Sequence, residues 1–265
     1  MLDGKSIGLV LSGGGIRGMA HIGLIKAMEA QGIVAHRISG TSVGALVGGL
    51  YAKGSSVEEM LNFFRETPLF QYSLFAINKP GLIATERYVP IFRKFFPQDS
   101  FEALKIPLLV VATNLMSGTE KVFSKGPLIP TLLASAALPP VFSPVEIDGH
   151  FYADGGIMNN FPKEHLEKDS DFIIGSNVSI TFPLEKKDLR NPIQLAQRVT
   201  SLMVHASNHE KLRTCDLFIE PMDLEKIGVL DKKGIEKAFT IGYDQASRAI
   251  ELFLKAPPVG DQTSS

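Results

Sequence analysis

The sequence predicts a three-layer α/β/α fold with a mostly parallel central sheet. Short, nearly continuous apolar segments rich in β-branched residues alternate with segments of helical periodicity along the 265 residues. Strands buried on both faces have this apolar character, and strand–helix alternation is typical of a parallel sheet covered by helices on both sides. No repeat or break in composition divides the chain. We therefore expect one domain over residues 1–256 and a disordered tail over 257–265.

The expected elements follow from these two patterns in chain order. Apolar β-branched runs predict strands, and an additional short aromatic strand is expected just before Asp154. The other strands are expected at residues 6–12, 35–40, 107–115, 120–124, 171–178 and 216–221. Apolar residues at helical spacing predict the helices. They are expected at residues 17–32, 42–54, 56–66, 84–96, 128–138, 191–213 and 234–255.

Composition excludes several classes of function and location. The formal net charge is −1 and no run of Lys or Arg occurs, so a nucleic-acid partner is not expected. A single cysteine, Cys215, excludes an internal disulfide and fits a reducing compartment, so we expect a cytoplasmic location. The first apolar run lacks a cleavage-site pattern and is interpreted as a strand. No segment approaches the ~18 apolar residues of a membrane span. Membrane contact is therefore expected to be peripheral at most.

Gly13, Gly15 and Gly18 form a G-x-G-x-x-G pattern between the first strand and the first helix. A dinucleotide site would also need a carboxylate at the end of the second strand, but Ser39-Gly40-Thr41-Ser42 stands there. No Gly-Lys-Ser/Thr follows, so a Walker loop is also disfavoured. Consecutive glycines free several N–H groups at a helix N-terminus to bind a phosphate or an oxyanion. A plain strand-to-helix turn remains the alternative.

The second strand ends in Gly40-Thr41-Ser42-Val43-Gly44, a G-x-S-x-G pattern. A nucleophilic serine on a sharp strand-to-helix turn has strained backbone, so residues two positions away on each side must lack a Cβ. The helix that follows would favour negative charge beside Ser42. Because the carboxyl ends of adjacent parallel strands share one edge, this turn and the glycine turn are expected to face each other.

A nucleophilic serine needs a base, and no histidine is well placed to be one. The six histidines are His21, His36, His150, His165, His205 and His209. The spacing of the last two suits a metal site, but no third ligand accompanies them, so a solvated helix face is preferred. Asp154, followed by Gly155 and Gly156, is the candidate base, although an Asp that caps its own turn would look the same.

The three motifs together resemble the patatin-like phospholipase family. The resemblance rests on residues 13–18, 40–44 and 154–156, in this order and at these intervals, and covers about residues 6–179. It extends to "ATNLMSGTEKVFSKG", "ASAALPPVFSPVEIDG" and "DGGIMNNFP". Bacterial members and the catalytic domains of the neuropathy-target-esterase group are the most similar. Beyond about residue 180 the match is loose.

This resemblance implies a Ser–Asp pair in place of a triad, without a metal or a cofactor. Ser42 would be the nucleophile, Asp154 the base, and the amides of Gly14 and Gly15, with Gly13, the oxyanion hole. The implied activity is hydrolysis of acyl esters, chiefly phospholipids or lysophospholipids. Arg17 matches the basic position of the glycine motif and would hold the oxyanion loop, an exposed first-turn arginine being the alternative. Asn114 stands where many members carry Asp, a change expected to leave the chemistry intact.

Other interpretations remain open at this level. An acyltransferase of related fold would also carry a serine elbow, but is expected to pair it with histidine. A nucleotide- or anion-binding module would use the glycine loop, with Ser42 as a helix cap. The loop over residues 68–83 would line an acyl-chain pocket, form an interfacial lid or fill ordinary core. Its large apolar residues are Leu69, Phe70, Tyr72, Leu74, Phe75 and Ile77.

Overall fold

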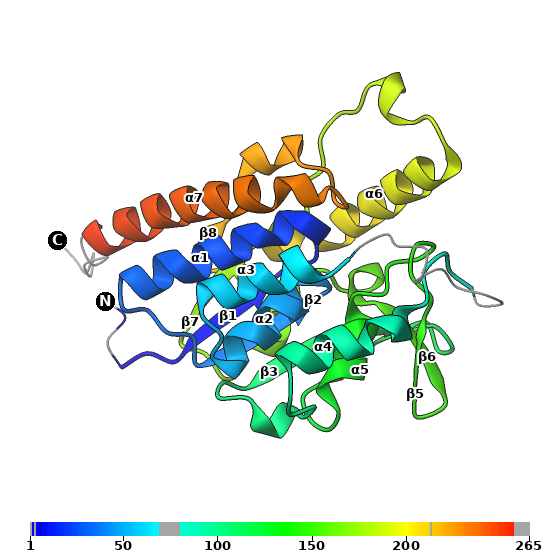
Figure 1. The fold of residues 1–265 in the computed structure, drawn as a ribbon. Coiled ribbons are helices and arrows are strands. Elements are labelled where there is room, and N and C mark those ends of the chain that lie inside the picture. Colours follow the sequence, from blue (N-terminus) through cyan, green and yellow to red (C-terminus); the bar gives the residue numbers. More distant parts are fainter. Residues whose placement is uncertain (1, 3, 69–79, 213, 257–265) are drawn as a thin grey trace.

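The structure is a computed structural model that describes residues 2, 4–68, 80–212 and 214–256 (Figure 1). Its centre is one eight-stranded sheet with the order β5-β6-β3-β2-β1-β7-β8, in which β4 also pairs with β3. The strands are β1 Ile7–Leu11, β2 Arg37–Thr41, β3 Leu108–Asn114, β4 Thr119–Phe123, β5 Val145–Ile147, β6 His150–Asp154, β7 Phe172–Ser176 and β8 Leu217–Ile219. The helices are α1 Met19–Ala30, α2 Val43–Lys53, α3 Val57–Glu66, α4 Val89–Phe95, α5 Leu128–Ser135, α6 Pro192–Leu212 and α7 Ile235–Lys255.

The expected mostly parallel sheet is confirmed. Strands β1, β2, β3, β7 and β8 run parallel to one another, whereas β4, β5 and β6 pair antiparallel. The antiparallel strands all lie on the β3 side of the sheet. That side carries one of the candidate site residues, as described below.

The two faces of the sheet are covered unequally. Strand β1 shows the alternation: Leu9 and Leu11 belong to the large core, whereas Val10 belongs to a small cluster on the other face. Helices α1, α2, α3, α5 and α7 contribute to the large core. The small cluster is completed by Phe161, Leu166 and residues near the end of α6. The helical layer is therefore thick on the face that carries Leu9 and Leu11 and thin on the face that carries Val10.

Three elements differ from the sequence-based expectation. The helix expected at 84–96 is divided into a 3₁₀ turn, Thr85–Tyr88, and α4, which has Pro90 in its first turn. Proline is tolerated there because its missing N–H would have no partner within the helix. Strand β5 was not expected, because it is only three residues long. Strand β8 is shorter than the apolar run that predicts it.

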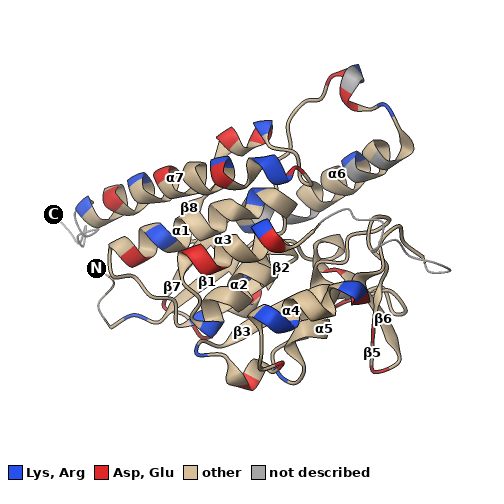
Figure 2. Cartoon of the chain, in the orientation of Figure 1, with Lys and Arg blue, Asp and Glu red and all other residues tan. Residues whose placement is uncertain are grey.

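Charges of both signs are interspersed over α3 and α7, whereas the charged residues of α4 are both basic (Figure 2). Within the described part of the chain, no helix combines the length and apolar character that crossing a bilayer requires. The expected tail, 257–265, and residues 69–79 of the apolar loop lie outside the described residues.

Candidate active site

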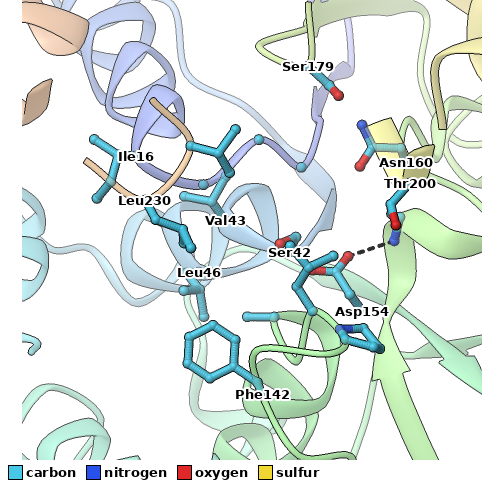
Figure 3. Close-up of a pocket in the computed structure, with 18 of the residues that line it drawn as sticks. Ile16, Ser42, Val43, Leu46, Phe142, Asp154, Asn160, Ser179, Thr200 and Leu230 are labelled. Carbon is cyan, nitrogen blue, oxygen red and sulfur yellow. Dashed lines mark hydrogen bonds between the residues drawn. The ribbon is translucent and has the colours of Figure 1, made fainter. Parts of the chain in front are cut away.

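Strands β2 and β6 meet end to end along one edge of β3. Thr41 pairs with Val111 in the parallel direction, and Asp154 pairs with the next residue, Ala112, in the antiparallel direction. Strand β4 occupies the opposite edge of the same β3 residues. The carboxyl ends of β2 and β6 therefore converge, and Ser42, the residue after Thr41, lies beside Asp154 (Figure 3).

Ser42 occupies the sharp turn between β2 and α2. Its backbone has φ 55° and ψ −127°, a conformation that non-glycine residues rarely adopt. A Cβ at Gly40 would lie 2.6 Å from Gly44 O, and a Cβ at Gly44 would lie 2.2 Å from Leu11 O. Both glycines are therefore required sterically, as the G-x-S-x-G pattern predicts. The Ser42 amide donates to Ser135 Oγ at 2.9 Å, which fixes the turn against α5.

Asp154 is a buried carboxylate, 4% exposed. Its Oδ1 accepts a hydrogen bond from the Gly156 amide at 2.8 Å, and the Ser42 side chain lies close enough to lower its pKa. Burial raises the pKa of Asp154 from 3.8 to about 6, and the interactions with Ser42 and Gly156 only partly offset that effect. At neutral pH the group is thus an ionised carboxylate of unusually high basicity in contact with a serine hydroxyl.

The loop between β1 and α1 presents open amides above Ser42. Among the described residues, neither Gly14 N nor Gly15 N has an acceptor. Gly13 N, by contrast, donates to Asn160 O at 3.4 Å. Gly15 has φ 61°, and a Cβ there would lie 2.2 Å from Val229 O. Of the three expected oxyanion donors, Gly14 and Gly15 are thus available, whereas Gly13 already has a partner.

Arg17 is buried and holds this loop through hydrogen bonds to two distant segments. Its Nε donates to Ile227 O at 2.7 Å and its Nη1 to Ile180 O at 3.1 Å. The guanidinium carbon lies 5.0 Å from the centre of the Phe182 ring. Burial lowers the pKa of the Arg17 guanidinium. The exposed alternative for Arg17 is therefore wrong, and the side chain ties the glycine loop to two distant segments.

The remaining motif glycines are points of close packing. A Cβ at Gly18 would lie 2.4 Å from Val43 Cγ2, so this glycine lets the first helical turn approach α2. A Cβ at Gly155 would lie 2.2 Å from Val111 O, and one at Gly156 would lie 3.0 Å from Asp154 Oδ1. These glycines let the segment after β6 pass close to β3 and fold back over the carboxylate.

The histidines occupy other places. No histidine is among the described residues that line the cavity around Ser42. His21 is fully buried: Nε2 donates to Ser12 O at 2.9 Å and Nδ1 accepts from Ser176 Oγ at 2.8 Å. Burial lowers the pKa of His21 to about 4, so the ring is a neutral bridge between the ends of β1 and β7.

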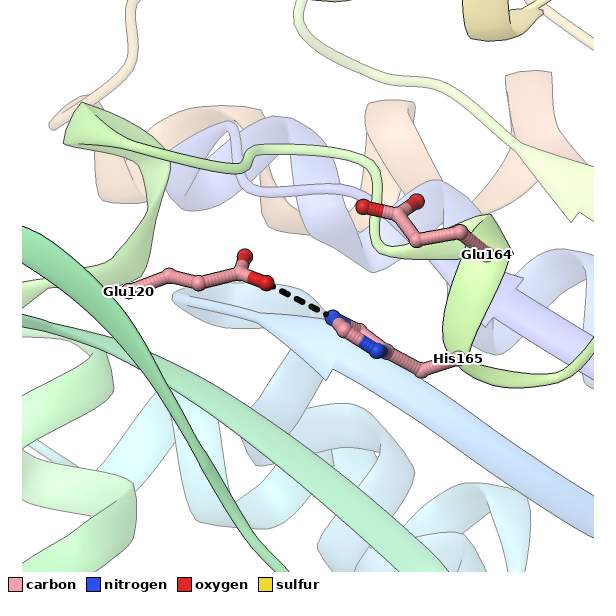
Figure 4. Close-up of side chains that lie close together, drawn as sticks. All are labelled: Glu120, Glu164 and His165. Atoms are coloured by element: carbon pink, nitrogen blue, oxygen red, sulfur yellow. Dashed lines mark ion pairs between the residues drawn. The ribbon is translucent and has the colours of Figure 1, made fainter.

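His165 belongs to a polar cluster with Glu120 and Glu164 (Figure 4). Its Nε2 lies 3.1 Å from Glu120 Oε1. The Lys211 ammonium lies 2.7 Å from Glu164 Oε1 and supplies a positive charge to this cluster.

The side chain of His209, half of the expected helical pair, lies outside the described residues. Asn114 caps the turn after β3, its Oδ1 accepting from Met116 N at 2.9 Å.

A cavity of about 530 Å³ opens over Ser42 and Asp154. In Figure 3, Ile16, Leu46, Phe142 and Leu230 lie on one side of the pair, and Asn160, Ser179 and Thr200 on the other. The apolar side is extended by aromatic residues of α3, α4 and the turn before α4. These are Phe63, Phe64, Tyr88 and Phe92. Helical periodicity predicts that these aromatic residues are buried, but it does not distinguish a core position from a cavity wall. The expected lining residues of 69–77 lie outside the described residues.

Comparison with known proteins agrees with this arrangement. A sequence model of the family described as "Patatin-like phospholipase" matches residues 9–166. An uncharacterised NTE family protein of Mycobacterium tuberculosis is 36% identical over 161 residues, 59% of this chain and 44% of that protein. A second one from the same organism is 28% identical over 281 residues, 94% of this chain and 47% of that protein. Mouse patatin-like phospholipase domain-containing protein 6 is 33% identical over 177 residues, 62% of this chain and 13% of that protein. The chain thus spans less than half the length of each of these relatives.

Two solved structures share the fold. VipD from Legionella pneumophila has a TM-score of 0.55 and 16% identity, with 93% of this chain and 67% of that chain covered. Human GIVD cytosolic phospholipase A2 has a TM-score of 0.51 and 12% identity, with 94% and 58% covered. The family match includes the glycine loop, the serine turn and the Asp154 turn, and it extends over more than half of the residues. The chain belongs to the patatin-like phospholipase family.

Proposed function

We propose that the chain is a serine acyl hydrolase that cleaves lipid esters with Ser42 as nucleophile and Asp154 as base. The observation that carries the proposal is the end-to-end meeting of β2 and β6, which places the Ser42 hydroxyl against a buried carboxylate. The open amides of Gly14 and Gly15 lie in the lining of the same cavity. Nucleophile, base and oxyanion donors are the three parts that acyl transfer requires.

In the first half-reaction, Ser42 Oγ attacks the acyl carbonyl while its proton passes to Asp154. The carbonyl oxygen gains the negative charge, which the Gly14 and Gly15 amides and the N-terminus of α2 stabilise. When the tetrahedral species collapses, the bond to the alcohol oxygen breaks and the proton on Asp154 passes to that oxygen. The products are a free alcohol and an acyl ester on Ser42.

In the second half-reaction, water repeats the sequence. Asp154 takes a proton from water, the hydroxide attacks the acyl–Ser42 carbonyl, and the oxyanion forms at the same amides. Collapse returns the proton to Ser42 Oγ and releases the fatty acid. The raised pKa of Asp154 suits both roles, because a base with a pKa near the working pH accepts and returns a proton with little loss.

The cavity supports a lipid ester as substrate. Its volume of about 530 Å³ is that of a small-molecule site, and its aromatic side suits an acyl chain. Family membership adds phospholipids and lysophospholipids as the substrate class to test. The structural neighbour cytosolic phospholipase A2 is described in complex with a fluorophosphonate, which makes this reagent class a suitable probe.

The direct test is labelling with a fluorophosphonate followed by mapping of the modified peptide. We expect one modified serine, Ser42, and loss of labelling in Ser42→Ala. Product analysis with a phospholipid and a lysophospholipid then distinguishes hydrolysis from transfer to an alcohol, because both share the acyl–Ser42 intermediate. Absence of Ser42 labelling in folded protein would reject the proposal.

Helix α6 supports peripheral contact with a lipid surface. One face of the helix lines the cavity with Thr200, Ser201 and Val204. The opposite face carries exposed apolar side chains, namely Leu195, Val199, Leu202 and Met203. A bilayer on that face would lie beside the cavity that receives the acyl chain. We expect Met203→Glu to weaken sedimentation with phosphatidylcholine vesicles. Leu252→Glu, at an equally exposed leucine of α7, is the matched control and should have no effect.

A further inference from the structure

Asn160 carries a buried side chain that has no partner in the described protein. The residue is 5% exposed and lies in the wall of the cavity over Ser42 (Figure 3). Its main-chain oxygen accepts from Gly13 N at 3.4 Å, which fixes the residue against the glycine loop. No hydrogen bond to its side-chain amide occurs among the described residues. A carboxamide that is open in the wall of a cavity and has no protein partner is placed to bond a ligand there.

The position of this carboxamide is set by two motif glycines. A Cβ at Gly13 would lie 2.4 Å from Asn160 Oδ1 and 3.1 Å from Ser42 Cβ. A Cβ at Gly156 would lie 2.7 Å from Asn160 Oδ1 and 3.0 Å from Asp154 Oδ1. The absence of side chains at both positions therefore makes room for the Asn160 amide beside the nucleophile and the base.

The adjacent Asn159 shows that the open amide is particular to Asn160. Its Nδ2 donates to Glu120 Oε2 at 2.8 Å and to Glu164 Oε1 at 2.7 Å, and its Oδ1 accepts from Lys211 Nζ at 3.3 Å. Asn159 is 1% exposed and is absent from the described lining of the cavity. Two consecutive asparagines thus have opposite roles, one bound within the protein and the other open to the site.

The cavity indicates which part of a substrate Asn160 would meet. Ser179 and Thr200 lie on the same side of the Ser42–Asp154 pair as Asn160, away from the apolar wall formed by Leu46 and Phe142 (Figure 3). The acyl chain is expected on the apolar side. The alcohol part of the ester, whose oxygen receives the proton from Asp154, is then on the side of Asn160.

We propose that Asn160 is a specificity-determining contact whose carboxamide hydrogen-bonds an oxygen of the alcohol part of the substrate. This rests on the proposed esterase function and adds the class of alcohol: one with a hydroxyl or ester oxygen next to the scissile bond, as in a glycerol ester. A simple alkyl alcohol would offer the amide no such partner. Sites built around such a hydrogen bond discriminate strongly against analogues that lack it.

The test compares two esters of one short acyl chain, glyceryl hexanoate and propyl hexanoate, in kcat/KM. The enzyme should prefer the glyceryl ester. Asn160→Leu, of similar shape but without hydrogen bonds, should lower kcat/KM for the glyceryl ester by about tenfold or more, the cost of losing one buried partner. Its kcat/KM for the propyl ester should change by much less. Asn159→Leu is the matched control and should lower the melting temperature while leaving the ratio of the two kcat/KM values unchanged.

Fluorophosphonate labelling separates this proposal from the one on which it rests. The reagent carries no glycerol-like alcohol, so Asn160→Leu should be labelled at Ser42 nearly as fast as the wild type. An equal loss of kcat/KM on both esters, or no loss on either, would overturn the role of Asn160. A wild-type protein that is not labelled at Ser42 would instead reject the esterase function.

Discussion

Ser42 and Asp154 lie side by side because their strands pair with adjacent residues of β3. Thr41, which precedes Ser42, pairs with Val111, and Asp154 pairs with Ala112. Two strands that approach from opposite directions thus deliver a hydroxyl and a carboxylate to one point. Such register is rigid, since a slip of one residue would move every side chain of a strand to the other face. The Ser42–Asp154 contact is therefore built into the sheet and does not depend on a long loop.

Ser42→Ala should abolish ester hydrolysis and leave the fold intact, because only the nucleophile is removed. Ser42→Gly should be equally inactive but more stable than Ser42→Ala by about 1 kcal/mol, since glycine adopts the positive φ without strain. Turnover on a short-chain ester and urea unfolding measure the two effects. Activity retained by Ser42→Ala would contradict the assignment of the nucleophile.

Asp154→Asn should be inactive and yet more stable than the wild type at neutral pH. The folded-state pKa of Asp154 is raised from 3.8 to about 6, so its ionisation opposes folding as the pH rises through this range. At about 1.4 kcal/mol per pKa unit, the cost at pH 7 is about 3 kcal/mol, and the uncharged amide avoids it. The variant's free energy of unfolding in urea should therefore exceed that of the wild type by a margin that shrinks as the pH falls from 7 to 5. A constant difference over that range would mean that Asp154 is not desolvated.

The pH dependence of kcat/KM should show an acid limb. Asp154 must be ionised to accept the Ser42 proton, so activity should fall as the pH drops through about 6. The rate of fluorophosphonate labelling should follow the same limb, because it needs the same proton transfer. A limb near pH 4, the ordinary range of an exposed aspartate, would show that burial does not tune this group.

Much of the site could be predicted from the sequence because its motifs are local. Gly40 and Gly44 are required by the turn that holds Ser42, so the pattern carries its own steric reason. The junction of β2 with β6 could not be predicted, since the partner and direction of a short strand depend on contacts distant in the chain. Nor could periodicity show that Arg17 is buried, because its acceptors, Ile180 O and Ile227 O, are far away in sequence.

The aromatic wall illustrates a second limit. Phe63 and Phe92 belong to helices whose burial the apolar pattern predicts, but the pattern is the same for a core contact and a cavity wall. The same holds for the two asparagines after β6. The motif containing Asn159 and Asn160 is visible in the sequence, whereas only the structure distinguishes the bonded amide from the open one.

Arg17→Ala should lower both stability and kcat, with a smaller effect on KM. The side chain joins Ile227 O and Ile180 O behind the glycine loop, and each charged hydrogen bond is worth about 1.5–3 kcal/mol. Loss of the Arg17 side chain should leave the Gly14 and Gly15 N–H groups poorly aligned with the substrate oxygen. Arg17→Lys should be intermediate, because a single ammonium cannot reproduce the planar fork. Equal kcat in the alanine variant and the wild type would limit Arg17 to a purely structural role.

Gly15→Ala and Gly14→Ala test whether the glycine loop is an oxyanion hole or a nucleotide site. A Cβ at Gly15 would lie 2.2 Å from Val229 O, and one at Gly14 would lie 2.7 Å from Val178 Cγ2, so either alanine must displace the loop. Loss of one donor should cost about 3–4 kcal/mol of transition-state stabilisation, a drop in kcat of roughly 10²–10³. KM should change much less, because the charge on the substrate oxygen develops only in the transition state.

The opposing measurement is titration of the wild type with NAD, FAD and ATP by calorimetry. The loop lies against Ser42 and Asp154, and β2 ends without the carboxylate that a ribose would need, so we expect no binding. Binding of any of the three at micromolar concentration, lost in Gly15→Ala, would assign the loop to a nucleotide. The two measurements are independent, because a nucleotide site would lose affinity in the variant whereas an oxyanion hole loses only rate.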